Sequence, residues 1–442
     1  MRLEINTTKP WLLQSVGLFV LRYGGLFIVP PALSCPAYLF FKKDVPKISG
    51  IRENTHLFTH AKNSKEWIEL PLQIDTYTDK GGFAYYPANH QWMKEKHKDS
   101  DRITFNMGQF GKSSDIKDIP CRGKGIYRVT NYLNRKEVAF LTNCYTKKSR
   151  KKARSSPVYY QSNRHILNTE FYSYIFNQSN YLLFDQVWLT QMHKREKSVS
   201  SMASDIYIYN DLSNFFPITF DSENIESQLE NRLVGPVGVN ASLSFFARIL
   251  FLKLKLSLTT DVSFFKDSAH IPMVLFIPMD AKSYLNEESG VFYHWALSKT
   301  LKKRAKTIQM PIFTAKVHKL LQHNSAEYAK IGLKYCRPNG FCYFMFKINS
   351  TPTFIMQFSL AKKLVQQGFF PIFVNNLKTY EDRMEWGLSE ETTSEDSRIG
   401  FYFSTSGLSQ GNHAWDFWMR LGSKLADDSR CPHPLYIKSL NP

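Results

Sequence analysis

The feature of this sequence that most constrains its fold is a strict alternation of apolar and polar residues in short segments. Residues 252–258 read Leu-Lys-Leu-Lys-Leu-Ser-Leu, and residues 67–75 alternate in the same way. A period of two predicts β-strands with one buried and one wet face, as in antiparallel sheets. Pro71 predicts an edge strand or a bulge in the second segment, because proline cannot donate a ladder hydrogen bond.

Aromatic residues add to the β signal. The chain has 34 Phe and 23 Tyr, and 43% of its residues are hydrophobic. Aromatic side chains favour strands, and this much apolar material is enough for a packed core. Mixed helical periodicity appears later, at 292–309, 314–331 and 359–367. We therefore predict a mainly β protein with an antiparallel β-sandwich-like architecture and a few inserted helices.

A chain of 442 residues exceeds the size at which single cores stop growing, so two domains are expected. A like-charge block at 147–154 repels itself and predicts an exposed loop that joins them. Its basic residues, which also form a candidate anion-binding site, are Lys147, Lys148, Arg150, Lys151, Lys152 and Arg154. The expected organisation is a signal peptide or N-terminal anchor at 1–34, an N-terminal β domain at 35–157, and a larger β-rich domain with helical insertions at 158–442.

Residues 1–34 have the features of an export signal. A basic start precedes an apolar run, and the small residues Ala32 and Ser34 come just before Cys35. This order predicts a secretory signal cleaved before Cys35, where a lipid anchor is an option. The alternatives are a retained anchor, in which Arg22 would cost about 2.5–3.5 kcal/mol on insertion scales, and a buried strand pair in a cytosolic protein. We expect an extracytoplasmic protein: periplasmic, outer membrane-associated or secreted.

The cysteines support that compartment. Cys336 and Cys342 flank a Pro-Asn-Gly turn, which brings two strand-like arms within the range of a disulfide. Cys121 and Cys144 bracket an earlier hairpin in a similar way. Two disulfides indicate an oxidising environment. The alternative is reduced core cysteines in a cytosolic protein, whereas a zinc site is disfavoured because the chain has no Cys-x-x-Cys pair.

A first group of candidate functional residues is acidic. It consists of Asp75, Asp79, Asp99 and Asp101, which lie at the expected strand ends and loops. Clustered carboxylates are suited to Ca²⁺, which prefers oxygen ligands, or to acid–base work in glycoside hydrolysis. The spacing matches no defined calcium loop, so polar strand-end residues are the favoured interpretation, and no cofactor is expected unless it is Ca²⁺.

A second group lies near the C-terminus and combines aromatic rings with polar side chains. Its members are Asn412, His413, Trp415, Asp416 and Trp418. Rings stack on the apolar faces of sugars while polar groups bind the hydroxyls, so this group predicts a glycan-binding site. The competing and favoured interpretation is that the two tryptophans, three residues apart, belong to the core.

The charge of the chain indicates the class of partner. A formal net charge of +19 and a pI of about 9.5 suit anionic partners. In an exported protein these are anionic glycans or the cell-envelope surface, and in a cytosolic protein nucleic acid. Solvated surface charge is an equal alternative. The sequence has no His-Glu-x-x-His, Gly-x-Ser-x-Gly, phosphate-loop or dinucleotide-binding motif, which leaves no motif-defined enzyme class.

The segments 67–75 and 101–111 together resemble a recurring pair in uncharacterised exported bacterial proteins. In those proteins the second segment tends to end in Asp-x-Gly, whereas Gln109 stands at the acidic position here. The resemblance implies export and a β-rich fold, and the change at Gln109 disfavours a shared metal site.

Three functional hypotheses follow. The first is an exported protein that associates with the cell envelope or binds glycans, without a cofactor. The second is an extracytoplasmic carbohydrate-active enzyme, of the glycoside hydrolase or lyase type, that uses the acidic residues named above. The third is a cytosolic protein that binds nucleic acid through basic segments such as 147–154, which export would exclude.

Overall fold

The structure is a computed structural model in which strands dominate and helices are few, as predicted. It describes residues 36–48, 50–61, 64, 66–76, 91–106, 110–112, 116–131, 136–147, 158–169, 172–177, 184–189, 202–210, 218–220, 224–249, 252–283, 285, 289–297, 307–309, 333–336, 340–349, 354–374, 398–404, 408–415, 417–422 and 435–440. The predicted export signal at 1–34, and with it Cys35, lies outside these residues. Within them, no helix has the length and apolar character needed to span a lipid bilayer.

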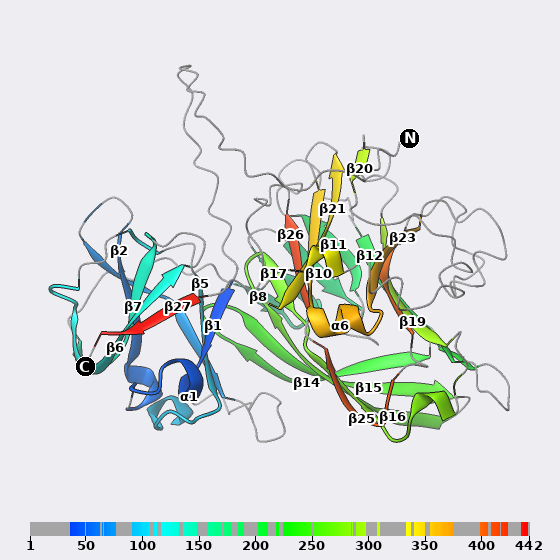
Figure 1. The fold of residues 1–442 in the computed structure, drawn as a ribbon, viewed down its shortest axis with the longest axis horizontal. Helices are drawn as coiled ribbons and strands as arrows, with labels where there is room; N and C mark the ends of the chain where they lie inside the picture. Colours follow the sequence, from blue (N-terminus) through cyan, green and yellow to red (C-terminus); the bar gives the residue numbers. More distant parts are fainter. Residues whose placement is uncertain are drawn as a thin grey trace, which may run out of the picture.

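Strands of the N-terminal part of the chain, drawn in blue and cyan in Figure 1, form two small antiparallel sheets together with one red strand from near the C-terminus. The first has the order β1 (Pro36–Phe40), β5 (Asp101–Asn106), β4 (Leu72–Thr76). The second has the order β27 (Leu435–Ser439), β6 (Cys121–Asn131), β7 (Val138–Lys147), β2 (Thr55–His60), β3 (Trp67–Leu70). A shared core of apolar side chains from both sheets, which includes Leu57, Ile103 and Leu141, holds them together.

Pro71 explains how two sheets arise from one alternating segment. The segment 67–75 is split at this proline into β3 and β4, and each half is an edge strand of a different sheet. Inside a strand, a proline would leave a gap in the hydrogen-bond ladder because it has no N–H. At a strand end no such hydrogen bond is needed, so a proline is tolerated there. The predicted edge position is therefore confirmed, and the same residue marks the crossing between the two sheets.

The larger part is built on two extended antiparallel sheets. One contains, in order, β23 (Phe370–Val374), β24 (Arg398–Ser404), β19 (Gly290–Leu297), β12 (Met202–Asn210), β11 (Phe184–Leu189), β10 (Tyr172–Phe176), β9 (Ile166–Asn168) and β8 (Tyr159–Gln161), with β13 (Ile218–Phe220) beside β12. The other contains β14 (Ile225–Val234), β15 (Val239–Ile249), β16 (Leu252–Phe264), β17 (Ser268–His270), β26 (Phe417–Gly422), β22 (Phe354–Ala361), β21 (Phe341–Asn349) and β20 (Thr307–Gln309). From β16 the second sheet also branches to β18 (Met273–Ile277) and then β25 (Gly411–Trp415).

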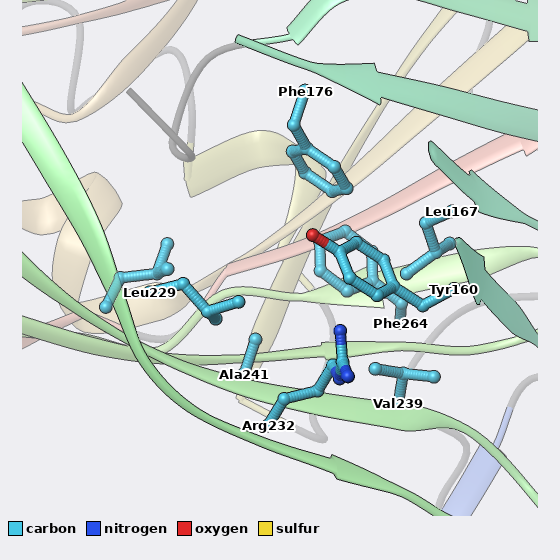
Figure 2. A pocket seen from close by; sticks show the side chains of 9 residues that line it. Tyr160, Leu167, Phe176, Leu229, Arg232, Val239, Ala241 and Phe264 are labelled. Atoms are coloured by element: carbon cyan, nitrogen blue, oxygen red, sulfur yellow. The ribbon is translucent and has the colours of Figure 1, made fainter. Parts of the chain in front are cut away.

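Aromatic side chains fill the space between these two sheets. Trp295 of β19 stacks on Phe358 of β22 at 5.3 Å between ring centroids, and Phe401 of β24 meets Phe358 edge-on at 4.5 Å. Farther along, Tyr174 of β10 contacts Phe264 of β16 at 5.5 Å. Such offset and edge-to-face pairs stabilise a core beyond their burial alone. At one open edge of the two sheets a small cavity lies between them (Figure 2).

The described helices are short. They are α1 (Phe41–Asp44), α6 (Lys362–Gln366) and the 3₁₀ turns η1 (Arg52–Asn54), η2 (Gln91–Lys94), η4 (Ala281–Ser283) and η5 (Leu333–Tyr335). The predicted helix at 292–309 is wrong at both ends, because residues 292–297 belong to β19 and residues 307–309 form β20, while residues 298–306 lie outside the described residues. The helix predicted at 359–367 begins only after β22 ends at Ala361, and that at 314–331 lies outside the described residues. Alternate residues of β19 pack into the core. This tertiary packing favours a strand, although the mixed periodicity of the segment suggested a helix.

The last strand returns to the N-terminal part. β27 pairs with β6 from Leu435 opposite Asn131 to Ser439 opposite Tyr127. The sequence places these residues with the larger domain, whereas in the structure they complete the five-stranded sheet, which the red arrow among blue and cyan strands shows in Figure 1. The boundary at residue 157 stays a prediction.

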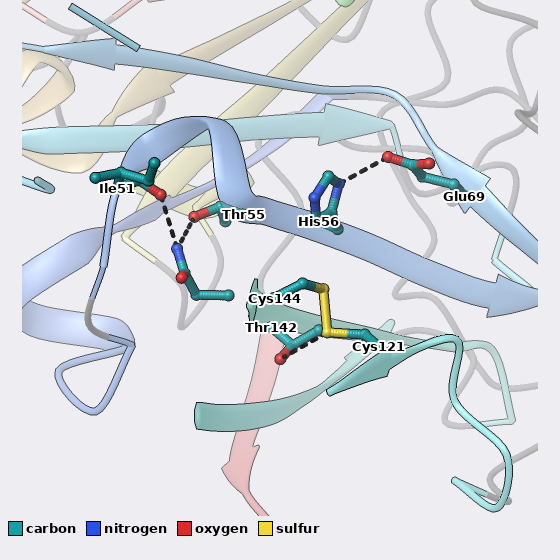
Figure 3. Close-up of a disulfide and its surroundings, with 8 residues drawn as sticks. Ile51, Thr55, His56, Glu69, Cys121, Thr142 and Cys144 are labelled. Atoms are coloured by element: carbon teal, nitrogen blue, oxygen red, sulfur yellow. Dashed lines mark hydrogen bonds and ion pairs between the residues drawn. A yellow bond between two sulfur atoms is a disulfide. The ribbon is translucent and has the colours of Figure 1, made fainter. Parts of the chain in front are cut away.

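Two disulfides join the pairs that the sequence predicts. Cys121 and Cys144 link the strands of the β6–β7 hairpin, with their Cα atoms 5.5 Å apart (Figure 3). Cys336 and Cys342 close the shorter loop, where Gly340 adopts the positive φ of +85° that its turn requires. Disulfides form and persist in oxidising compartments, so the two bridges indicate an extracytoplasmic environment.

Candidate functional site

The acidic residues predicted as a cation site are separated by the pleat of one sheet. Asp75 lies opposite Arg102 and Thr76 lies opposite Asp101 in the β4–β5 ladder. Directly opposed residues share a face and neighbouring residues alternate, so Asp75 and Asp101 point to opposite faces. Asp99 is exposed, and Asp79 lies outside the described residues. The structure therefore does not bring the predicted carboxylates together.

Both buried carboxylates are instead matched by arginines. Asp75 accepts hydrogen bonds from Arg102 Nη2 at 3.2 Å and from Gln73 Nε2 at 3.0 Å. Asp101 accepts from Arg52 Nε at 2.9 Å and Nη2 at 3.1 Å. Both side chains of each pair are at most 2% exposed. Neutralised in this way, the two aspartates are structural groups of the N-terminal part.

Asp101 has the more elaborate surroundings. His97 Nδ1 lies 2.9 Å from its Oδ2, and the Thr76 hydroxyl donates to Oδ1 at 2.7 Å. Burial raises the pKa of this carboxyl, but hydrogen bonds from His97, Arg52 and Thr76 outweigh it and hold the pKa below its usual value. The carboxylate is thus kept ionised. No set of three or more His, Cys, Asp or Glu side chains in the described part of the chain is arranged to hold a metal ion.

The C-terminal group is also divided by the structure. Trp418 on β26 is fully buried, stacked on His270 at 4.2 Å and on Tyr38 at 6.2 Å between centroids. It joins the N-terminal sheet to the larger part and cannot serve as a sugar platform, so the core interpretation holds for this residue. The side chain of Trp415 and the whole of Asp416 lie outside the described residues. Asn412 and His413 remain accessible on β25.

Asn412 takes part in an exposed surface that the sequence did not indicate. β25 pairs only with β18 among the described strands, and Phe276 lies directly opposite Asn412. Phe276 is 46% exposed and Val274, on the same face of β18, is 41% exposed. We call Val274, Phe276 and Asn412 the ribbon face. The all-apolar segment 273–277 predicts a buried strand, whereas in the structure its alternate residues are exposed.

Hydrogen bonds fix one end of the ribbon formed by β18 and β25, which joins the larger sheet through β16. The backbone N–H of Gln410 donates to Asp280 Oδ1 at 2.6 Å, and its side-chain amide donates to the Pro278 carbonyl at 2.9 Å. His413, which faces away from Phe276, has its Nε2 2.7 Å from the Ser409 carbonyl oxygen. These contacts join the segment after β18 to the segment before β25, at the end of the ribbon where Phe276 and Asn412 lie.

The predicted anion-binding block is described only at its start. Lys147 ends β7, where its backbone lies opposite Cys121. Lys148, Arg150, Lys151, Lys152 and Arg154 lie outside the described residues, so the anion-binding role of the block stays a prediction.

Comparisons with known proteins give no family for this chain. No protein-family model matches the sequence, and no curated protein matches it. Two solved structures from Enterococcus faecalis are similar at low level: an α-mannosidase of strain V583, with 8% identity and a TM-score of 0.34, and a protein in the glycosyl hydrolase family 38, with 8% identity and a TM-score of 0.36. The alignments cover 90% and 93% of this chain, which spans about half of each structure, 47% and 46%. Similarity at this level carries no inference about activity.

Proposed function

We propose that this protein is an extracytoplasmic, cell-envelope-associated protein that binds glycans through its ribbon face. The observation that carries the proposal is the pairing of the exposed Phe276 ring with the exposed Asn412 amide on directly opposed positions of β18 and β25. The two disulfides support an oxidising location for such a protein.

The chemistry of the ribbon face suits a sugar. An aromatic ring stacks on the C–H face of a pyranose, while a side-chain amide both donates to and accepts from hydroxyls. Val274 extends the apolar area along the strand. The net charge of +19 favours glycans that carry carboxylates or phosphates.

Affinity electrophoresis tests the proposal. The full-length, disulfide-bonded protein is run in native gels that contain polygalacturonate as an acidic glycan or dextran as a neutral one. We expect polygalacturonate to retard it. Phe276→Ser should weaken this retardation about tenfold, since an aromatic contact contributes about 0.5–1.5 kcal/mol in addition to its burial. Asn412→Ala should weaken it as well.

Val234→Ser is the matched control, because Val234 is an exposed apolar residue on β14, 54% accessible, and lies outside the ribbon face. It should migrate like the unmodified protein. The proposal is wrong if neither glycan retards the protein, or if Phe276→Ser and Val234→Ser behave alike. Release of reducing ends from either glycan would instead favour the carbohydrate-active enzyme.

A further inference from the structure

Two cations face each other where the last strand of the chain pairs with the N-terminal part. Arg128 on β6 lies directly opposite Lys438 on β27, which is the red arrow in the five-stranded sheet of Figure 1. Directly opposed residues point to the same face of a sheet, with Cβ atoms about 4.5–5.5 Å apart. Like charges at this spacing repel each other and destabilise the strand pair. A negative charge bound between them would offset that cost.

The sheet itself does not supply this negative charge. Within the described part of the chain, neither the Arg128 nor the Lys438 side chain takes part in an ion pair or a hydrogen bond. From Arg128 the same row of residues runs across the sheet through Phe140 on β7 and Phe58 on β2 to Glu69 on β3. The carboxylate of Glu69 is therefore three strands away from Arg128, and it is engaged by a histidine of β2 at 2.8 Å.

The surroundings of Arg128 strengthen its attraction for an anion. Its neighbours in the row, Phe140 and Phe58, are completely buried, so one side of the guanidinium lies against apolar side chains. Arg128 is half-buried, and its Nε is shielded from solvent without a hydrogen-bond acceptor. Electrostatic interactions are stronger in such a low-dielectric environment than in water. Lys438 is exposed, so an anion can reach the pair from solvent.

We propose that Arg128 and Lys438 together bind a phosphate group. A guanidinium donates two parallel hydrogen bonds to phosphate oxygens, and an ammonium adds a second positive charge. A phosphate monoester carries between about 1.5 and 2 negative charges at neutral pH, which matches two cations, whereas a carboxylate would leave one of them unmatched. This site is formed by β6 and β27, apart from the strands of the ribbon face, so it does not depend on the glycan-binding proposal.

Thermal unfolding of the full-length, disulfide-bonded protein tests the proposal, in sodium phosphate and in sodium chloride of matched ionic strength at neutral pH. Phosphate should raise the unfolding midpoint, because a ligand that binds only the folded state stabilises it. Lys438→Gln removes the repulsion, so in chloride this variant should unfold at a higher temperature than the unmodified protein. In phosphate the order should reverse, because the variant has lost half of the site. Isothermal titration calorimetry with inorganic phosphate should show binding weakened about tenfold or more in Lys438→Gln and in Arg128→Gln.

Lys363→Gln is the matched control, since Lys363 is an exposed lysine on α6 and its replacement removes the same charge from another part of the protein. Phosphate also stabilises folded proteins in general by exclusion from their surface, so the informative quantity is the difference between variants. Lys363→Gln should keep the full response to phosphate. The proposal is overturned if phosphate shifts Lys438→Gln and Lys363→Gln equally, or if millimolar phosphate gives no heat of binding.

A second measurement identifies the source of the phosphate group. Phosphatidylcholine vesicles with and without phosphatidic acid are sedimented with the full-length protein. Co-sedimentation that requires phosphatidic acid and is lost in Lys438→Gln would identify a lipid headgroup. A response to inorganic phosphate without co-sedimentation would identify a soluble phosphate, and both outcomes support the site. Vesicle binding that Lys438→Gln leaves unchanged, without any response to inorganic phosphate, would place phosphate recognition elsewhere on the protein.

Discussion

Gln73, on β4 of the N-terminal part, accepts a hydrogen bond at 3.0 Å from the backbone N–H of Gly238, 165 residues later in the chain. The same side chain donates to Asp75, which accepts from Arg102. Arg102 Nη2 then lies 3.4 Å from the Ser263 hydroxyl on β16. This buried polar chain joins the small sheets to the large sandwich, next to the stack of Tyr38, His270 and Trp418.

Asp75→Ala should therefore destabilise the whole protein. Removing the carboxylate breaks the buried ion pair with Arg102, whose side chain is 2% exposed, and removing one partner of a buried pair costs about 3–5 kcal/mol. Urea unfolding followed by circular dichroism measures the loss. Glu226→Gln is the control: it breaks the pair with Arg248, whose side chain is 56% exposed, and should cost at most about 1 kcal/mol. Equal losses in both variants would contradict the role given to the junction.

The alternation of 67–75 predicted strand structure because one face of each strand is buried. It could not predict that Pro71 divides the segment between two sheets, since the choice of partner depends on β2 and β5, which are distant in sequence. The two disulfides were predictable because each pair flanks its own turn or hairpin. The apolar run 273–277 predicted a buried strand, but Phe276 is exposed. Composition alone does not show that this strand lies in a ribbon at the edge of a sheet.

The candidate sites were less predictable than the fold. Asp75 and Asp101 suggested a cluster by their spacing, but the pleat places them on opposite faces, each with an arginine. The spacing of Trp415 and Trp418 suggested one surface, whereas each lies on a different strand with different neighbours. The register shift between Leu229 and Asn231 on β14 has no sequence signature such as glycine, so it emerges only from the pairing of β14 with β15.

Asp101 should make the free energy of unfolding depend on pH in the acidic range. Its pKa is lowered in the folded state, so it contributes stability that is present above the unfolded pKa of about 3.9 and lost as pH falls below it. Asp101→Asn should be less stable than the unmodified protein at neutral pH, and the gap should narrow below about pH 4. Urea midpoints between neutral pH and pH 3 measure this gap. A difference in stability between Asp101→Asn and the unmodified protein that does not change with pH would contradict the prediction.

The two disulfides should contribute unequally to stability. In the chain-entropy model a cross-link stabilises more when it closes a longer loop. Sequence separations of 23 for Cys121–Cys144 and 6 for Cys336–Cys342 correspond to about 3.4 and about 2.2 kcal/mol in that model. Replacing both members of the first pair by serine should lower the free energy of unfolding about 1 kcal/mol more than replacing both of the second. Peptide mapping without reduction checks the pairings first, and a larger loss from the second pair would exclude loop entropy as the cause.

Tyr172 should stabilise the turn that leads from β16 to β17. Its hydroxyl, fully buried, lies 2.6 Å from the Phe265 carbonyl oxygen and 2.9 Å from that of Ser268. Tyr172→Phe leaves those acceptors without the hydroxyl and should cost about 1–3 kcal/mol in urea unfolding at neutral pH. Tyr159→Phe, at an exposed site on β8, should change stability by no more than about 0.5 kcal/mol.

The difference in stability between the unmodified protein and Tyr172→Phe should also change at alkaline pH. Burial raises the pKa of Tyr172 well above its usual value, and the nearby Tyr174 and Asp267 act in the same direction. A group with a raised pKa contributes stability that is present below its unfolded pKa, about 10 for tyrosine, and is lost as pH rises beyond it. The phenylalanine variant has no proton to lose, so the difference in stability between it and the unmodified protein should shrink above about pH 10. A gap that stays constant between neutral pH and pH 11 would show that the Tyr172 hydroxyl titrates alike in the folded and unfolded chains.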